Sequence, residues 1–365
     1  ASHEENYCAV DLFTSFGTST SALESNGYVV VAMVESNEVC HFQLESVTDG
    51  VIYSSASRLA DAISKNQIKL PKIQLVNCNI AQPLPRSQYH THSSEIMAPQ
   101  GETQVSPLNH VSLTLRLVQA LNGTQSDWQD RVAIVTFMCH DRSHWRAVRR
   151  EEDAISGMGY SLHASTIVNT ASHGCTLSAM ITVVTMTLRS NPSLQTIVYQ
   201  PHDDSPPVSS ILDPRKNSSS TLLAQGPKQW YRSHRNTLHA SRSNPIKLVE
   251  SKRTAYYSAD RPVPCKLFPI LPAIVINPTE HYRGWRGRLL TIEEVMRAYG
   301  LQETLQQILT KIYSRNGIPS ILSTLTPAAP LTSIFSTTMA KLKVGGVRGE
   351  RSDTVTTVLK CLIVI

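Results

Sequence analysis

Residues 7–35 read YCAVDLFTSFGTSTSALESNGYVVVAMVE, and this stretch decides the fold. The apolar run Tyr7–Phe13 is typical of a buried strand, and a turn of small residues follows it. Thr20–Asn26 can form a short helix that ends at Gly27, because glycine readily adopts the left-handed conformation at a helix C-terminus. Tyr28–Val34 is a second strand, and Glu35 stands at its end. The sequence therefore predicts a β-turn-α-β unit, and in nucleotide-type folds an acid at this place binds ribose hydroxyls.

Composition indicates a globular, mildly basic protein. The chain has 365 residues, of which 41% are hydrophobic and 17% charged, and its net charge is +6 at pH 7. This length suits two domains, or one large α/β domain with an insertion, and the apolar content is enough for a sizeable core. The positive charge mildly favours a polyanionic partner such as nucleic acid.

Cysteine usage and the chain ends predict an intracellular protein. The seven cysteines show no CxxC spacing, and their odd number argues against a disulfide framework, so we expect a reducing compartment. Nucleus, cytoplasm and virion are not distinguished. The first residues lack the basic and apolar regions of a signal peptide, and no apolar run reaches the length of a membrane span. Val358–Ile365 is apolar but short, and Lys360 interrupts it, so we expect a strand or a docked tail there and no membrane contact.

The middle of the chain continues to alternate strands with helices. Apolar periodicity predicts three buried strands and two helices. The strands are expected at Lys72–Asn77, Arg131–Val135 and Ile181–Leu188, and the helices at Leu113–Leu121 and Trp145–Gly157.

A polar loop is predicted between the first of these strands and the first helix. Residues 85–110 are rich in His, Ser, Gln and Pro, which is typical of a long connection. His90, His92 and His110 fall within it, but their spacing matches no strong metal site. We therefore expect no metal.

The segment from about residue 190 to 265 has a different character. Prolines break it repeatedly, and basic residues alternate with tryptophan and tyrosine. Cations contact phosphates and aromatic rings stack on bases or sugars, so this segment is a candidate nucleic-acid surface, with a protein-docking surface as the alternative. The residues assigned to nucleic-acid contact are Lys228, Arg232, Arg235, Arg242, Lys252 and Arg253.

Two motifs carry a resemblance to a known family. The first is Asp11-Leu12-Phe13-x-x-x-Gly17, followed by Glu35 at the end of the next strand. The second is residues 286–300, RGRLLTIEEVMRAYG, which reads as a helix with a capping box and a terminal glycine. Both resemble the cytosine-5 DNA methyltransferases, which open with Asp-Leu-Phe-x-Gly-x-Gly-Gly and later carry Arg-x-Leu-Thr-x-x-Glu-x-x-Arg. Residues 157–186 add a weaker match to the same family.

The resemblance covers residues 7–342 and implies a fold. It implies an α/β, Rossmann-like fold of the S-adenosylmethionine-dependent methyltransferases, with a small inserted recognition-type domain. The expected division is 1–190 for the first part of the α/β domain, 191–285 for the basic recognition-like domain, 286–345 for the return to the large domain, and 346–365 for a C-terminal tail.

The resemblance also implies where S-adenosylmethionine would bind. In the family the cofactor lies over the glycine turn, which assigns Phe13, Gly17 and Glu35 to cofactor binding. Ser15 and Thr18 replace two family glycines in this chain. Added side chains in a turn that must touch a ligand weaken binding, so we expect no cofactor, with S-adenosylmethionine still possible.

Several catalytic positions of the family are replaced in this chain. The nucleophilic cysteine of the family corresponds to Ala81, and its cytosine-binding Glu to Thr136. Three family positions after Gly174, two of them arginines, correspond to Leu177, Ala179 and Ile181. A methyl group cannot attack a base, and a threonine hydroxyl cannot replace a carboxylate. The pattern predicts that the nucleophile, the acid and the arginines are lost together.

Three functional hypotheses follow. The first is a catalytically inactive relative of the cytosine-5 DNA methyltransferases that binds nucleic acid or is a structural subunit of a larger assembly. The second is an active methyltransferase with a displaced nucleophile, either Cys78 or Cys139, although a buried structural thiol is the simpler interpretation of Cys78. The third is a protein-protein scaffold with no role in nucleic-acid binding.

Overall fold

The computed structural model describes most of the predicted α/β body of the chain. Described are residues 5–80, 107–123, 130–139, 142–163, 165–175, 177–178, 180–195, 197–201, 257–258, 271–272, 282–283, 292–301, 303–312, 322, 325–351 and 355. The recognition-like segment 191–285 lies mostly outside these residues, so the domain division stays a prediction.

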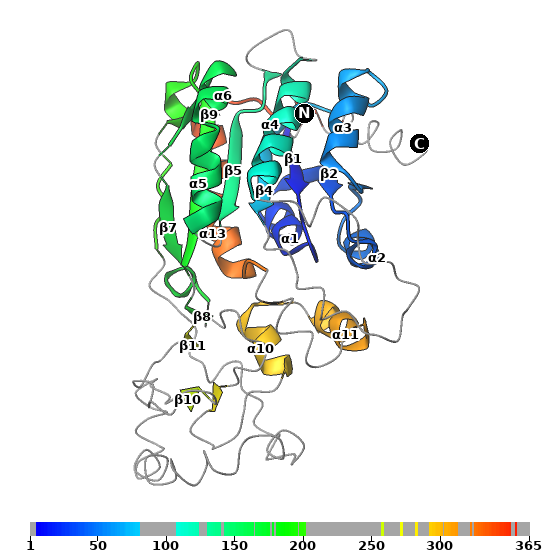
Figure 1. The fold of residues 1–365 in the computed structure, drawn as a ribbon, viewed down its shortest axis with the longest axis vertical. Coiled ribbons are helices and arrows are strands. Elements are labelled where there is room, and N and C mark those ends of the chain that lie inside the picture. Colours follow the sequence, from blue (N-terminus) through cyan, green and yellow to red (C-terminus); the bar gives the residue numbers. More distant parts are fainter. Residues whose placement is uncertain are drawn as a thin grey trace.

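A nine-stranded sheet forms the centre of the molecule (Figure 1). Its strands are β1 (Glu5–Leu12), β2 (Tyr28–Val34), β3 (Val51–Tyr53), β4 (Ile73–Ile80), β5 (Ile134–Cys139), β6 (Tyr160–Leu162), β7 (Thr166–Asn169), β9 (Met180–Leu188) and β13 (Glu350–Arg351). The strand order is β3-β2-β1-β4-β5-β9-β6, with β13 on β1 and β7 on β9. The strands from β1 to β5 are parallel, whereas β9 is antiparallel to its neighbours β5, β6 and β7.

Helices cover both faces of this sheet and make a three-layer α/β structure (Figure 1). One apolar cluster packs the sheet against the first group of helices through residues such as Leu59, Val118 and Val148. The other packs its opposite face against a second group through Leu23 and Phe335. The first group is α3 (Ala56–Ser64), α4 (Pro107–Gly123), α5 (Arg142–Arg150) and α6 (Glu152–Gly157); the second is α1 (Thr18–Ser25), α2 (Glu38–Val47) and α13 (Ala328–Val344).

Local sequence explains these elements. β2 reads YVVVAMV and is buried along nearly its whole length, as expected for a parallel strand covered on both faces. In α3 the side chain of Ser55 accepts a hydrogen bond from Arg58 N at 3.2 Å, which caps the first turn. The apolar side of α3, with Leu59 and Ile63, then faces the core.

The strand order reverses beside β1. The chain builds β1, β2 and β3 outward in one direction and then returns to place β4 on the other side of β1. In open α/β sheets, ligands bind in the crevice at the carboxyl ends of the strands where the order reverses. The carboxyl ends of β1 and β4 are therefore the first place to examine for a site.

The structure changes several of the expected boundaries. α4 begins at Pro107, so His110 lies in a helix and not in the polar loop expected over residues 85–110, and β4 runs on to Ile80. The strand expected at Arg131–Val135 begins only at Ile134 and runs to Cys139, so Thr136 lies inside β5 and not after it. The helix expected at Trp145–Gly157 is divided at Glu151 into α5 and α6. The last turn of α5 is basic and the first turn of α6 is acidic, which favours ending one helix and starting another there.

The C-terminal part returns to the large domain. Short helices α10 (Ile292–Ala298) and α11 (Glu303–Ile312) precede α13. Gly300 follows α10 in the left-handed conformation (φ 71°), in agreement with the prediction that this glycine ends the helix. β13 then pairs with the start of β1, and Val355 is buried in the core. Residues 358–365 lie outside the described residues. Among the helices that the structure describes, none is long and apolar enough to cross a lipid bilayer.

Candidate functional site

The turn after β1 has an unusual backbone. Phe13, Ser15 and Gly17 have positive φ angles of 57°, 52° and 78°. Positive φ is uncommon for residues other than glycine, and such residues concentrate at functional sites. The positive φ favours glycine at position 17, and a Cβ there would lie 2.8 Å from Leu44 Cδ2, so that side chain would have to shift.

The side chain of Glu35 lies beneath this turn. Its Oε2 accepts a hydrogen bond from Ser15 N at 2.7 Å, and its Oε1 accepts one from Asn37 N at 2.9 Å. Glu35 is only 2% exposed. Burial raises the pKa of its carboxyl, while the backbone hydrogen bonds lower it. The turn is thus folded onto the carboxylate that the resemblance assigns to cofactor binding.

Phe13 is also buried within the protein. Its ring packs edge-on against the imidazole of His110 in α4, with the ring centroids 4.3 Å apart. Phe13 was predicted from the sequence to contact the cofactor, and His110 was predicted to lie in the polar loop; in the structure their rings contact each other. His90 and His92 lie outside the described residues. Among those described, no group of three His, Cys, Asp or Glu side chains is arranged as a metal site.

A polar network surrounds Asp11 at the carboxyl end of β1. The hydroxyls of Ser19 and Thr20 donate to Asp11 Oδ2 at 2.6 and 2.8 Å. The amide groups of Asn77 and Asn79 in β4 donate to Oδ1 at 2.8 and 3.3 Å. Asp11 is fully buried, and burial raises its pKa to about 6 although the hydrogen bonds lower it. Each oxygen of this carboxylate therefore accepts two hydrogen bonds from the protein itself.

Thr136 extends the network into β5. Its hydroxyl donates to Asn77 Oδ1 at 2.8 Å, and the residue is fully buried. Asn77 thus connects Asp11 to Thr136, which the sequence resemblance aligns with an acid of the cytosine-5 methyltransferases. The hydroxyl of Thr136 has a structural partner in this chain.

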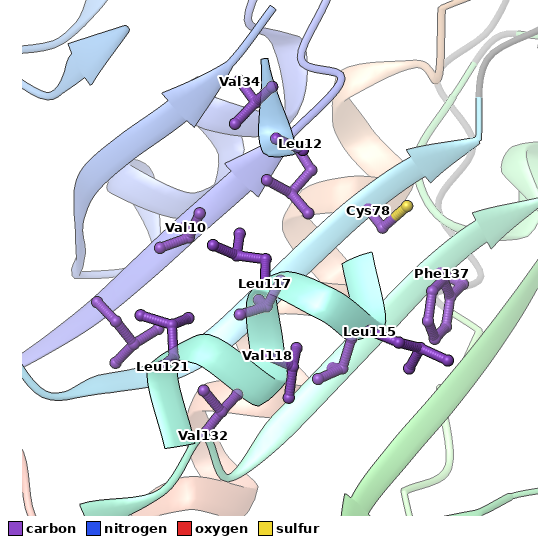
Figure 2. Close-up of a cluster of buried hydrophobic side chains, with 14 of the residues drawn as sticks. Val10, Leu12, Val34, Cys78, Leu115, Leu117, Val118, Leu121, Val132 and Phe137 are labelled. Carbon is purple, nitrogen blue, oxygen red and sulfur yellow. The ribbon is translucent and has the colours of Figure 1, made fainter. Parts of the chain in front are cut away.

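The two cysteines considered as nucleophiles are both fully buried. Cys78 in β4 lies among Leu12, Leu115 and other apolar side chains of the core (Figure 2). Burial raises the pKa of the Cys78 thiol to about 12, so the thiolate is scarce at neutral pH. The Cys139 thiol donates to the carbonyl oxygen of Phe137 at 3.9 Å.

The remaining assigned residues are only partly described. Ile181 is buried in β9 and pairs with Val168 of β7. Leu177 lies in β8 (Leu177–Ser178), which pairs with β11 (Leu271–Pro272). Ala81 and Ala179 lie outside the described residues, as do the six basic residues assigned to nucleic-acid contact.

Most residues of the Asp11 network were not predicted as site residues from the sequence. Ser19, Thr20, Asn77 and Asn79 were not assigned to the site. A signal for Asn77 and Asn79 exists, since both are polar residues in the second half of the buried strand β4. Polar side chains in a buried strand need partners, which indicates a network before its partners are known.

Comparison with known proteins supports the strand arrangement. No protein-family model matches the sequence, and no curated protein does. Among solved structures, Dnmt2 methyltransferase of S. pombe superposes with a TM-score of 0.54 at 10% identity, over 93% of this chain and 99% of that one. The fold is a Rossmann-like methyltransferase fold.

Two further solved structures extend this likeness. A prophage-encoded E. coli protein assigned to the DNA modification methyltransferases has a TM-score of 0.53 at 12% identity, over 93% of this chain and 100% of that one. A Spodoptera frugiperda DNMT2 mutant has a TM-score of 0.51 at 11% identity, with coverage of 93% and 100%. At such identities the likeness establishes the methyltransferase fold alone. It confirms the fold class that the sequence predicted.

Proposed function

We propose that this protein is a catalytically inactive relative of the cytosine-5 DNA methyltransferases. It acts by binding, either to nucleic acid or as a structural subunit of a larger assembly. One of the solved structures with this fold, the prophage-encoded E. coli protein, is assigned to the DNA modification methyltransferases, which supports a nucleic-acid partner.

The polar network around Asp11 is the observation that carries this proposal. Asp11 lies near the carboxyl end of β1, where a ligand would bind, and its polar contacts continue through Asn77 of β4 to Thr136 inside β5. Catalysis requires groups that point at the reacting atoms. Here the described side chains at this edge stabilise the fold, and the thiol of Cys78 is buried and protonated.

The cofactor residues, as they lie, do not fit S-adenosylmethionine. A ribose hydroxyl would have to reach the Glu35 carboxylate, yet that residue is 2% exposed and already accepts from Ser15 N and Asn37 N. The ring of Phe13 packs on His110. Binding would require the turn to open first. We therefore propose that the fold is retained without its cofactor.

Methyl transfer and cofactor binding test the inactive part of the proposal. The full chain is incubated with labelled S-adenosylmethionine and DNA, beside an active cytosine-5 methyltransferase as the positive control. We expect no label in DNA above background and no heat of cofactor binding by calorimetry. Label transfer above background by the wild-type chain would disprove the proposal. Undiminished transfer by Cys78→Ser or by Cys139→Ser would then remove that cysteine as the candidate nucleophile.

Salt-dependent binding tests the nucleic-acid part. Affinity for a DNA or RNA duplex is measured over a series of salt concentrations, because each phosphate contact adds about 0.9 to the slope of log K against log salt. Replacing Arg232 and Arg235 by Gln should lower that slope. The control is Lys65→Gln, which removes an exposed cation far from these arginines in the sequence and should leave the slope unchanged. Absence of binding even at low ionic strength would favour the protein scaffold.

A further inference from the structure

A cavity lies near the amino ends of β4 and β5, whereas the Asp11 network lies toward the carboxyl ends of the strands. Its volume is ≈ 160 Å³, and its polar lining includes Lys72, Arg131, Asn191 and Arg348. Lys72 directly precedes β4, and Arg131 lies shortly before β5, so both belong to the amino ends of these strands. We call this cavity, defined by those four residues, the basic pocket.

The charges that line the basic pocket are positive. Three cations contribute to its wall, and no acid does among the described residues that line it. Two acids lie close by: Asp130 pairs with Lys72 Nζ at 3.2 Å, and Glu350 Oε1 accepts from the backbone amide of Lys72 at 3.3 Å. Lys72, Arg131 and Arg348 carry three positive charges and the two acids carry two negative charges, so one positive charge remains in excess.

The guanidinium of Arg131 indicates that the pocket takes an anion. Its Nε is buried and, within the described part of the chain, has no hydrogen-bond partner. The side chain of Lys72 is only 10% exposed, so its charge is also largely withdrawn from water. A buried donor on a charged group is costly unless an acceptor meets it, and an anion in the pocket would supply that acceptor.

The wall of the pocket is preformed. Gly345 and Gly346 follow α13, and the Asn191 amide donates to Gly345 O at 3.0 Å. A Cβ on Gly345 would lie 2.9 Å from Leu194 Cδ2, so this turn is packed closely against the adjacent segment. A binding site whose walls are fixed by packing loses little entropy when a ligand enters.

We propose that the basic pocket binds a phosphate group. Arg131 and Arg348 supply planar donors that match tetrahedral oxyanions, and Lys72 supplies a compact charge. The cavity has room for a phosphorus atom and its four oxygens with accompanying water. The phosphate can come from free inorganic phosphate or from the 5′ end of a nucleic acid, since the recognised chemistry is the same.

Calorimetry with inorganic phosphate tests this site at constant ionic strength. We expect the wild-type chain and Lys343→Gln to bind equally, because Lys343 is an exposed cation near the pocket that does not line it. Arg131→Gln and Arg348→Gln should each weaken binding about tenfold or more, which is the effect of losing one charge-assisted hydrogen bond. Arg348 is exposed, so its variant decides the test if Arg131→Gln fails to fold.

A second arm identifies the source of the phosphate. Short oligonucleotides with a 5′-phosphate or a 5′-hydroxyl are compared on the same four proteins. A preference for the 5′-phosphate that disappears in Arg348→Gln supports the site with nucleic acid as the source, even where inorganic phosphate binds weakly. The proposal is overturned if neither probe binds the wild-type chain, or if both arginine variants bind as tightly as Lys343→Gln.

Discussion

Asp11 is the residue on which the interior of the site depends. Its carboxylate accepts hydrogen bonds from α1 and from β4, and Asn77 relays the network to Thr136. A buried charge is tolerated when several donors surround it, and removal of one partner leaves the others without an acceptor. Two substitutions test this residue-scale account.

Asp11→Asn should change the pH dependence of stability. Because the pKa of Asp11 is raised from 3.8 to about 6 in the folded chain, protons favour the folded state between these values. The wild-type free energy of unfolding should therefore fall, relative to the variant, by about 3 kcal/mol as the pH rises from below 3.8 to above 6. Urea unfolding of both proteins across this range measures the difference, and a difference that is constant with pH would contradict the account.

Thr136→Glu should destabilise the chain, even though it places a Glu at the position where the resemblance expects the cytosine-binding acid. A second carboxylate would enter a fully buried position beside the Asp11 network, whose described hydrogen-bond partners are hydroxyls and amides and include no cation. We expect a loss of about 3 kcal/mol or more in the free energy of unfolding. Thr136→Val should lose only about 1 kcal/mol, for one hydrogen bond.

The control for Thr136→Glu is Thr332→Glu, because Thr332 is exposed on α13. It should change stability by less than about 0.5 kcal/mol. Equal stability of Thr136→Glu and the wild-type chain would mean that the network has room for an acid.

At the scale of elements, α13 holds one face of the sheet. It packs beside α1, and the hydroxyls of Tyr28 in β2 and Thr338 in α13 lie 3.0 Å apart. Phe335 and Leu331 are fully buried in the cluster on this face. The helix is thus the late segment that completes a core begun by the first strands.

Phe335→Ala should lower the free energy of unfolding by about 3–5 kcal/mol, since truncation of a buried aromatic side chain leaves a cavity. Ser336→Ala, at the exposed neighbouring position, is the matched control and should stay within about 0.5 kcal/mol of the wild type. Chemical denaturation of the three proteins provides the comparison. A small effect of Phe335→Ala would mean that α13 packs loosely.

At the scale of the whole molecule, a late segment of the chain pairs with the first strand. Residues 350 and 351 pair with the start of β1, and the side chain of Gln74 donates to Arg348 O at 3.1 Å. Val355 is 2% exposed, while Val344, at the end of α13, is 75% exposed. The C-terminal segment therefore contributes to the core.

Val355→Ala should cost about 2 kcal/mol of stability, because it removes buried methyl groups from the core. Val344→Ala makes the same chemical change at an exposed position and should cost less than about 0.5 kcal/mol. Thermal unfolding midpoints of both variants check the contrast. Identical midpoints would mean that the end of the chain does not dock as described.

The sequence by itself determined the fold class and several of its elements. The apolar runs gave β1, β2 and β9 to within two residues, and glycine marked the ends of α1 and α10. These signals are local, because periodicity and helix ends depend on neighbours a few residues away. The division of α5 from α6 was missed although its charge pattern is also local.

Only the tertiary structure decided what the site residues do. Asp11, Ser19, Asn77 and Thr136 come from four elements, and their hydrogen bonds join positions up to 66 residues apart. The sequence predicted which family residues are replaced, but it did not predict that the turn after β1 covers Glu35. Burial and partner choice depend on strands brought together by the sheet, and no local pattern records them. The sequence predicted a loss of catalytic groups, but it did not predict that the polar groups around Asp11 bind one another.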